Sequence, residues 1–150
     1  MKIAVDFDGT IVENKYPAIG EEMLFAFTTL QALKRKGHQL ILWTFRVGSE
    51  LEEAVEFCRQ HGVEFDAVNC NYDGEIFDAN TPRKLNVDCF IDDRNVGGFI
   101  GWGRIYQLLC PEDKNFEKML LDIDAHNNYS KHKSLKKRIL YTLSGKKELF

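Results

Sequence analysis

Short apolar runs alternate with amphipathic segments along this chain, and that alternation constrains its fold more than any other feature. Brief apolar runs are typical of strands buried on both faces of a parallel sheet, and helical crossovers must join such strands. We therefore expect a three-layer, Rossmann-like α/β sandwich with helices on both faces and a mainly parallel sheet of about five strands. The expected strands are Lys2–Asp6, Leu40–Trp43, Asp66–Cys70, Val87–Ile91 and Arg104–Leu109.

The first expected helix is marked by its apolar spacing and by a glycine at its end. Met23, Phe27 and Leu30 share one face of a helix predicted over Glu21–Lys36, and Gly37 is its candidate C-cap.

Two further helices are predicted from end signals. Ser49 and Glu52 have the spacing of a capping box, which would open a helix that Gly62 ends. A later helix is predicted over residues 112–125, and a weaker helical pattern runs through the tail. The long segment Asn71–Asn86 has no clear periodicity, so we interpret it either as a local lid or as a plain surface connection.

Length and composition indicate one small globular domain. The chain has 150 residues, of which 44% are apolar, and no apolar run approaches the ~18 residues of a membrane span. The first residues lack the apolar stretch of a signal peptide, so we expect a cytoplasmic protein without a membrane partner. The four cysteines are widely spaced and are predicted to be core residues rather than disulfides or a zinc site.

The net charge of −3 hides an asymmetry between the body and the tail. Residues 126–150 carry seven Lys or Arg and a single acid, whereas residues 1–125 are strongly acidic. We therefore divide the chain into a main domain, 1–125, and a basic C-terminal helical tail, 126–150. A solvated tail, or one lying on its own acidic body, is the favoured interpretation. Nucleic-acid binding is the weaker one, because no aromatic residues interleave the basic cluster.

The first expected strand ends in the sequence Asp6-Phe7-Asp8-Gly9-Thr10. Two carboxylates held this close repel one another, and a hard cation such as Mg²⁺ removes that repulsion. Gly9 lets the chain bend sharply and would leave backbone N–H groups free to face an anion. Each Asp taken alone also fits a helix cap or turn, so the argument depends on the groups that lie beside them.

Two other strand ends carry matching groups. Thr44 and Arg46 come after the second strand, and the pair Asp92-Asp93 comes after the fourth, with Lys84 shortly before it. The carboxyl ends of parallel strands meet at one edge of the sheet, where ligands bind in open α/β folds. The sequence therefore predicts a magnesium site with phosphate-binding donors around it.

In this order, these motifs resemble the signature of the haloacid dehalogenase (HAD) superfamily, over roughly residues 2–109. The segments Leu42–Arg46 and Phe90–Asn95 are similar to a small, uncharacterised bacterial branch of HAD-like hydrolases. The resemblance implies a Mg²⁺-dependent phosphomonoester phosphatase that acts on a small phosphorylated substrate. Asp6 would be the nucleophile that forms an aspartyl-phosphate, and Asp8 the general acid and base.

The resemblance also implies how the metal and the phosphoryl group are held. Asp6, Asp92, Asp93 and the backbone carbonyl of Asp8 would hold Mg²⁺. Thr44 and Lys84 would hold the phosphoryl oxygens, helped by backbone N–H groups from Phe7 to Gly9. Arg46 and Arg94 would contact the leaving group or form structural ion pairs, and Arg83 is a second candidate for the role of Lys84.

Asp8 and the short loops favour a phosphatase over a dehalogenase or a mutase. Dehalogenases lack this second acid, because a halide leaves without a proton. Neither the Gly9–Gly20 loop nor the stretch between Thr44 and Lys84 has room for a cap domain, which mutases usually carry. An open site suits a large substrate, or a small one covered by a neighbouring subunit, so a homo-oligomer is an open alternative. Sugar phosphates, nucleotides and phosphorylated macromolecules all remain open as substrates.

Rival interpretations come from other classes of protein. A receiver domain uses similar groups, but its acidic pair lies on the first strand and its Lys comes last. A HAD-like protein kept for binding or regulation is the second rival, and a nucleic-acid phosphatase using the tail is a third. Trp102, in a glycine-rich segment, would either lie over a substrate or anchor a turn, and we favour the turn.

Overall fold

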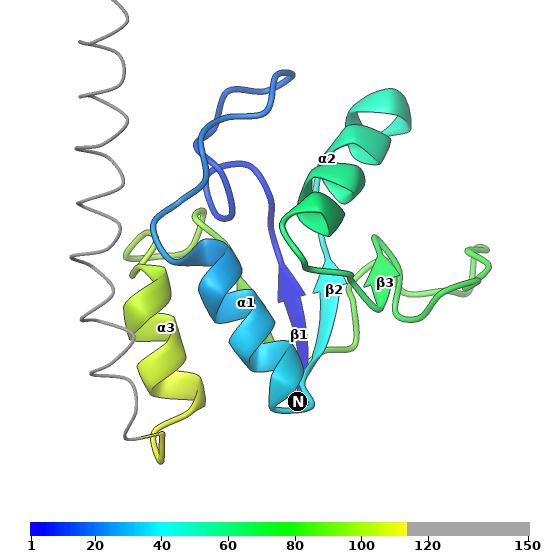
Figure 1. The fold of residues 1–150 in the computed structure, drawn as a ribbon. Coiled ribbons are helices and arrows are strands. Elements are labelled where there is room, and N and C mark those ends of the chain that lie inside the picture. The colour runs from blue at the N-terminus through cyan, green and yellow to red at the C-terminus, as the bar shows by residue number, and fades with distance from the viewer. Residues whose placement is uncertain (114–150) are drawn as a thin grey trace, which may run out of the picture. The chain divides into compact units, whose positions relative to one another are not determined.

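The computed structural model describes residues 1–113, and its helices and strands lie within one compact unit, Met1–Leu109 (Figure 1). In chain order the elements are β1 (Lys2–Val5), α1 (Ala26–Arg35), β2 (Gln39–Leu42), α2 (Gly48–Gln60), β3 (Ala67–Val68), β4 (Cys89–Ile91) and α3 (Trp102–Leu109). The helix predicted over 112–125 falls almost entirely outside the described residues. The basic tail predicted over 126–150 lies wholly outside them.

The described strands form one parallel sheet in the order β3-β2-β1-β4. Val5, at the end of β1, lies in register with Leu42 of β2 and with Ile91 of β4. The apolar residues of β1 and β2 are almost completely buried, as a central parallel strand requires. The predicted parallel α/β, Rossmann-like fold is confirmed at this level.

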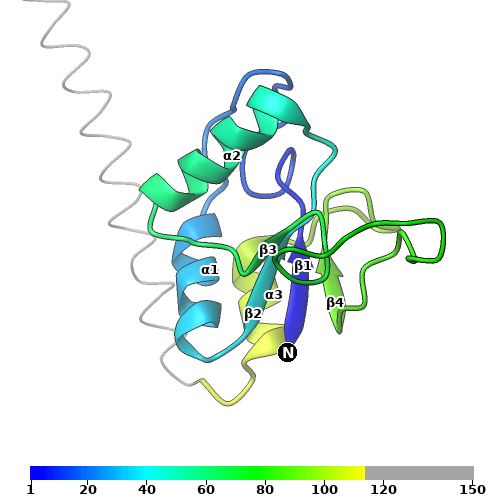
Figure 2. The same cartoon turned by 90° about the vertical axis from the view of Figure 1, so that its right-hand side faces the viewer.

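All three described helices lie on the same face of the sheet (Figures 1 and 2). The Phe57 ring of α2 packs 5.8 Å from that of Phe27 in α1 and edge-on to Phe7 after β1. On the opposite face, Leu85 from the segment between β3 and β4 packs with Ala4 and Ile41. The predicted covering of both faces by helices is therefore not found within residues 1–113, because an aperiodic segment takes the second face.

The predicted fifth strand, Arg104–Leu109, is wrong, because these residues belong to helix α3. Taken by itself, Arg104–Leu109 is a short, mostly apolar segment of the length typical of a strand. Counted from Trp102, the buried residues Trp102, Ile105 and Tyr106 have helical spacing and face the interior together.

Helix α1 begins at Ala26, later than the predicted Glu21. The backbone groups of Glu21 and Met23 are already hydrogen-bonded to the loop at 11–13, and Phe25 has a φ of 65°, which a helix interior does not allow. The predicted end is confirmed, because Gly37 has a φ of 81° just after α1.

The capping box predicted at Ser49 is wrong. Ser49 lies inside α2, its hydroxyl donates to Glu50, and the helix begins after Val47 without a side-chain cap. The end predicted at Gly62 is confirmed, since Gly62 comes just after α2 with a φ of 74°.

Two exclusions concern the described part of the chain. None of its helices is long and apolar enough to cross a membrane. The four cysteines form no disulfides with one another. Cys58 and Cys110 are buried core residues, as predicted, whereas Cys70 and Cys89 are only half-buried. Burial raises the pKa of the Cys58 thiol to about 12, so it is a core residue rather than a reactive thiol.

Candidate active site at the carboxyl edge of the sheet

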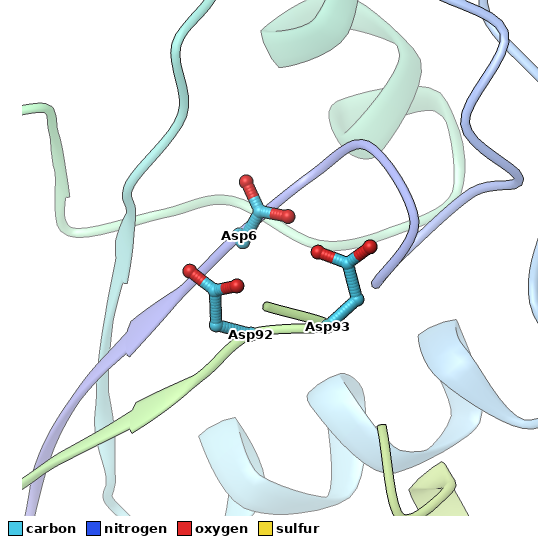
Figure 3. Close-up of side chains that lie close together, drawn as sticks. All are labelled: Asp6, Asp92 and Asp93. Atoms are coloured by element: carbon cyan, nitrogen blue, oxygen red, sulfur yellow. The ribbon is translucent and has the colours of Figure 1, made fainter. Parts of the chain in front are cut away.

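The carboxyl ends of the two adjacent strands β1 and β4 bring three acids together (Figure 3). Asp6 comes directly after β1, while Asp92 and Asp93 come directly after β4. Each residue offers one carboxylate oxygen to a group in which these oxygens lie within 4.8 Å of one another. All three residues are half-buried. Carboxylate oxygens gathered this closely are a donor set suited to a hard divalent cation.

Thr10 ties the two acidic segments together. Its hydroxyl donates to Asp6 Oδ2 at 3.1 Å and accepts the backbone N–H of Asp93 at 3.0 Å. Thr10 is completely buried, and its carbonyl oxygen accepts the indole N–H of Trp102 at 2.8 Å. Trp102 is therefore an anchoring residue in this structure, which agrees with the favoured interpretation of the glycine-rich segment.

Asp6 has the most perturbed carboxyl group of the site. Burial, followed by the negative charges of Asp92 and Asp93, raises its pKa to about 7, although hydrogen bonds from the Phe7 backbone and from Thr10 oppose this rise. A carboxyl group with such a pKa lies where positive charge is lacking. A bound cation would supply that charge.

Asp93 and Gly9 are fitted closely to one another. Asp93 Oδ1 is buried and has no hydrogen-bond partner among residues 1–113, although buried carboxylate oxygens normally have one. A Cβ atom on Gly9 would lie 2.3 Å from Asp93 Oδ2, and Gly9 has a φ of 89°. The expectation that the Gly9 N–H is free to bind an anion is wrong, since it donates to the carbonyl of Val12. Gly9 is needed for the turn and for the room that it leaves to Asp93.

Asp8 is held by Arg46 rather than by the acidic group. The Arg46 guanidinium donates to both Asp8 oxygens, at 2.8 and 2.7 Å, and to the carbonyls of Pro17 and Ala18. The Arg46 side chain is fully buried and that of Asp8 is 14% exposed. Hydrogen bonding to Asp8 raises the pKa of Arg46 further. Of the two roles considered for Arg46, the structure shows the ion pair.

A cavity of about 620 Å³ opens beside the acids, and we call it the acid cavity. Half-buried Thr44, just after β2, lies on its wall; its N–H donates to Asn69, and its hydroxyl oxygen accepts the N–H of Arg46. The hydroxyl proton of Thr44 is therefore available to a ligand. The lining residues are Asp6, Asp8, Asn14, Tyr16, Trp43, Thr44, Phe45, Asp92 and Arg94.

The predicted cations differ in their placement. Arg94 lines the acid cavity, and its guanidinium pairs with no carboxylate among residues 1–113. Lys84 is exposed and lies outside the acid cavity, whereas its neighbour Arg83 lines a second cavity beside it. The structure thus gathers Asp6, Asp8, Thr44 and Asp92 as predicted, but it does not bring Lys84 to them.

Sequence reasoning missed Tyr16 and Asn14, which line the acid cavity from the loop after β1. This loop folds back through backbone hydrogen bonds from Glu13 to Glu21 and from Met23 to Ile11. No periodic pattern marks such a loop. The two carbonyls that accept from Arg46 belong to it, so the buried guanidinium also fixes where the loop lies.

The comparisons with known proteins give one informative result. No family model and no curated protein matches the chain. The chain is similar to a solved structure of a conserved protein from Bacteroides thetaiotaomicron. The two are 53% identical with a TM-score of 0.71, and the match covers 76% of this chain and 93% of that one. At this identity and coverage, the chain belongs to the family of that conserved Bacteroides protein.

Proposed function

We propose that this protein is a Mg²⁺-dependent phosphohydrolase of the HAD type, which removes phosphate from monoesters through an aspartyl-phosphate on Asp6. The observation that carries the proposal is the group of Asp6, Asp92 and Asp93 beside a cavity that also holds Thr44 and Arg94. Phosphoryl transfer requires positioning and neutralisation of charge, and this arrangement can supply both.

The residues present fit a magnesium ion. The donors are carboxylate oxygens, which Mg²⁺ prefers, and Asp93 Oδ1 is a buried oxygen that has no partner in the described part of the chain. Asp6, Asp92 and Asp93 would hold the ion, with the Asp8 carbonyl added by the resemblance to HAD proteins. A bound Mg²⁺ would neutralise charge on the phosphoryl oxygens and lower the pKa of Asp6.

Asp6 and Asp92 both lie in the acidic group and on the wall of the acid cavity. Asp6 is the proposed nucleophile because it is the first acid of the motif that resembles the HAD signature. Its ionised carboxylate would attack phosphorus in line while the bond from phosphorus to the ester oxygen breaks. Water would then attack phosphorus of the aspartyl-phosphate, releasing inorganic phosphate and restoring Asp6. Ionisation of Asp6 is required for the first step, and a bound cation would favour it.

Asp8 is the proposed acid and base, and Arg46 is its positioning residue. In the first step Asp8 would give a proton to the leaving oxygen, and in the second it would take one from the attacking water. Both Asp8 oxygens now accept from Arg46. Before the first step, Asp8 must therefore take up a proton from solvent and exchange one of these hydrogen bonds for one to the substrate, while the other keeps the carboxyl group in place. The proton taken from water in the second step restores this protonated form.

Arg94 and Thr44 are the proposed donors to the phosphoryl oxygens, because both line the acid cavity. The role that the resemblance gives to Lys84 stays a prediction. Its exposed side chain would have to move to reach the cavity, so we expect Arg94→Ala to weaken phosphate binding more than Lys84→Ala.

The test is phosphate release from a broad panel of phosphomonoesters, with Mg²⁺ and with a chelator. We expect Mg²⁺-dependent release by the wild type and a loss of about a thousandfold or more in Asp6→Asn. Asp73→Asn is the matched control, since Asp73 is exposed and lies outside the acid cavity. Undiminished activity in Asp6→Asn, or no release by the wild type from any substrate, would overturn the proposal and leave a binding function in its place.

A further inference from the structure

A second cavity of about 370 Å³ adjoins the acid cavity, and we call it the aromatic cavity. It shares four lining residues with the acid cavity: Tyr16, Trp43, Thr44 and Phe45. It then extends to Phe77 and Arg83, which lie in the segment between β3 and β4. The two cavities are therefore neighbouring parts of one surface, with Thr44 on their common wall.

Several aromatic rings that line the aromatic cavity remain exposed to solvent in the folded chain. Phe45 is 92% exposed and Tyr16 is 50% exposed, and Phe77 also remains exposed. Exposed aromatic rings gathered around a cavity mark a binding surface more often than isolated ones do. Their flat faces favour stacking against another ring.

Hydrogen bonds hold the chain on two sides of the aromatic cavity, beside Tyr16 and at Thr44. The Arg46 guanidinium lies 5.3 Å from the centre of the Tyr16 ring and donates to the carbonyls of Pro17 and Ala18, which follow Tyr16. On the other side, the Thr44 N–H donates to Asn69 Oδ1 at 2.8 Å and holds the chain that leads to Phe45. A ligand would therefore meet a backbone that is already held in place on these two sides, which lowers the entropy lost on binding.

From this arrangement we infer that the aromatic cavity is the leaving-group subsite and that it takes the base of a nucleoside monophosphate. The inference rests on the proposed function and adds a substrate class to it. The phosphoryl group would lie at Asp6, the sugar along the shared wall near Thr44, and the base among Phe45, Tyr16 and Phe77. An aryl phosphate fits less well, because its ring is bonded to the ester oxygen and would lie in the acid cavity itself.

The kinetic test compares substrates that differ only in the base. We expect kcat/KM to be roughly tenfold or more higher for adenosine 5′-monophosphate than for ribose 5-phosphate, as for one stacked base. Phenyl phosphate, which has a ring without a sugar spacer, should not share this advantage. Phe45→Ala should lower the ratio of the two kcat/KM values about tenfold. Tyr72→Ala is the matched control and should preserve the ratio, since Tyr72 is exposed but lines neither cavity.

A binding measurement gives a readout that does not depend on turnover. The chain has two tryptophans, of which Trp43 lines both cavities and Trp102 is buried. Adenosine, which has no phosphate, should quench the fluorescence of Trp43, and Phe45→Ala should weaken this binding.

The outcomes separate the two proposals. Equal kcat/KM values for adenosine 5′-monophosphate and ribose 5-phosphate would overturn the subsite, and so would a ratio of these values that is unchanged in Phe45→Ala. Phosphate release from either substrate would still support the proposed phosphatase. A higher kcat/KM for phenyl phosphate than for the nucleotide would also overturn the subsite. Absence of release from every substrate would overturn the phosphatase, and absence of quenching by adenosine would overturn the subsite by itself.

Discussion

Asp6 has the carboxyl group whose pKa the site perturbs most. It lies at the end of a buried strand, accepts a hydrogen bond from Thr10 and faces two further acids. Its pKa of about 7 is far above the ordinary value of 3.8, and burial is the largest cause. At neutral pH the chain therefore holds this group near the balance between its charged and neutral forms.

We predict that the stability of the metal-free protein falls as the pH rises from about 4 through about 7. Because the folded-state pKa of Asp6 is raised, the folded chain keeps a proton that the unfolded chain releases in this range. The melting temperature should fall by about 4 °C or more across this window, and Asp6→Asn should flatten the dependence. Thermal melts at several pH values in chelator measure it. An equal slope in Asp6→Asn would contradict the assignment to Asp6.

Gly9 and Asp93 show how closely one backbone position limits the acidic group. We predict that Gly9→Ala weakens Mg²⁺ binding about tenfold, because its Cβ atom would displace the Asp93 carboxylate. Gly74→Ala is the matched control, since Gly74 has a φ of 79° with nothing within 4 Å of an added Cβ atom. Calorimetric titration with Mg²⁺ measures both variants. Equal losses of affinity would show that backbone strain, and not the contact with Asp93, is responsible.

At the scale of elements, α3 supports the site from outside it. Trp102 is the first residue of this helix, and its buried indole N–H donates to the carbonyl of Thr10. The hydroxyl of Thr10 is hydrogen-bonded to both the Asp6 carboxylate and the Asp93 backbone N–H. Helix α3 thus reaches the acidic group through one residue of the loop after β1.

We predict that Trp102→Phe lowers the free energy of unfolding by about 2 kcal/mol, because it leaves the buried Thr10 carbonyl without this donor. Trp43→Phe is the control and should change stability by less than about 1 kcal/mol, since Trp43 is half-buried and its indole donates to no acceptor within residues 1–113. Urea unfolding monitored by circular dichroism measures both. A larger loss in Trp43→Phe would contradict this role of Trp102.

The strands that carry the acids could be predicted because their signals are local. Ile3 to Val5 form an unbroken apolar run, and parallel strands place the residues at their carboxyl ends along one edge of the sheet. The start of α1 could not be predicted, because hydrogen bonds to the loop at 11–13 occupy Glu21 and Met23. The burial of Arg46 also depends on a loop that is distant in sequence, and no periodicity reports such a contact.

At the scale of the whole molecule, the strand order explains why the motifs act together. Strand β1 lies between β2 and β4, so the acids after β1 and β4 and the hydroxyl after β2 share one edge. The described helices lie on one face, and the segment from β3 to β4 contributes Leu85 to the other face and Phe77 to the aromatic cavity. One irregular segment thus both covers the sheet and borders the site.

The stereochemical course at phosphorus tests the central claim, a covalent intermediate on Asp6, most directly. Each in-line displacement inverts phosphorus, so transfer to Asp6 and then to water must give overall retention. The measurement uses a phosphomonoester with a chiral, isotopically labelled thiophosphoryl group, hydrolysed by the full chain with Mg²⁺ in labelled water. We predict retention. Inversion would mean that water attacks the substrate directly, and it would contradict the role of Asp6 as nucleophile.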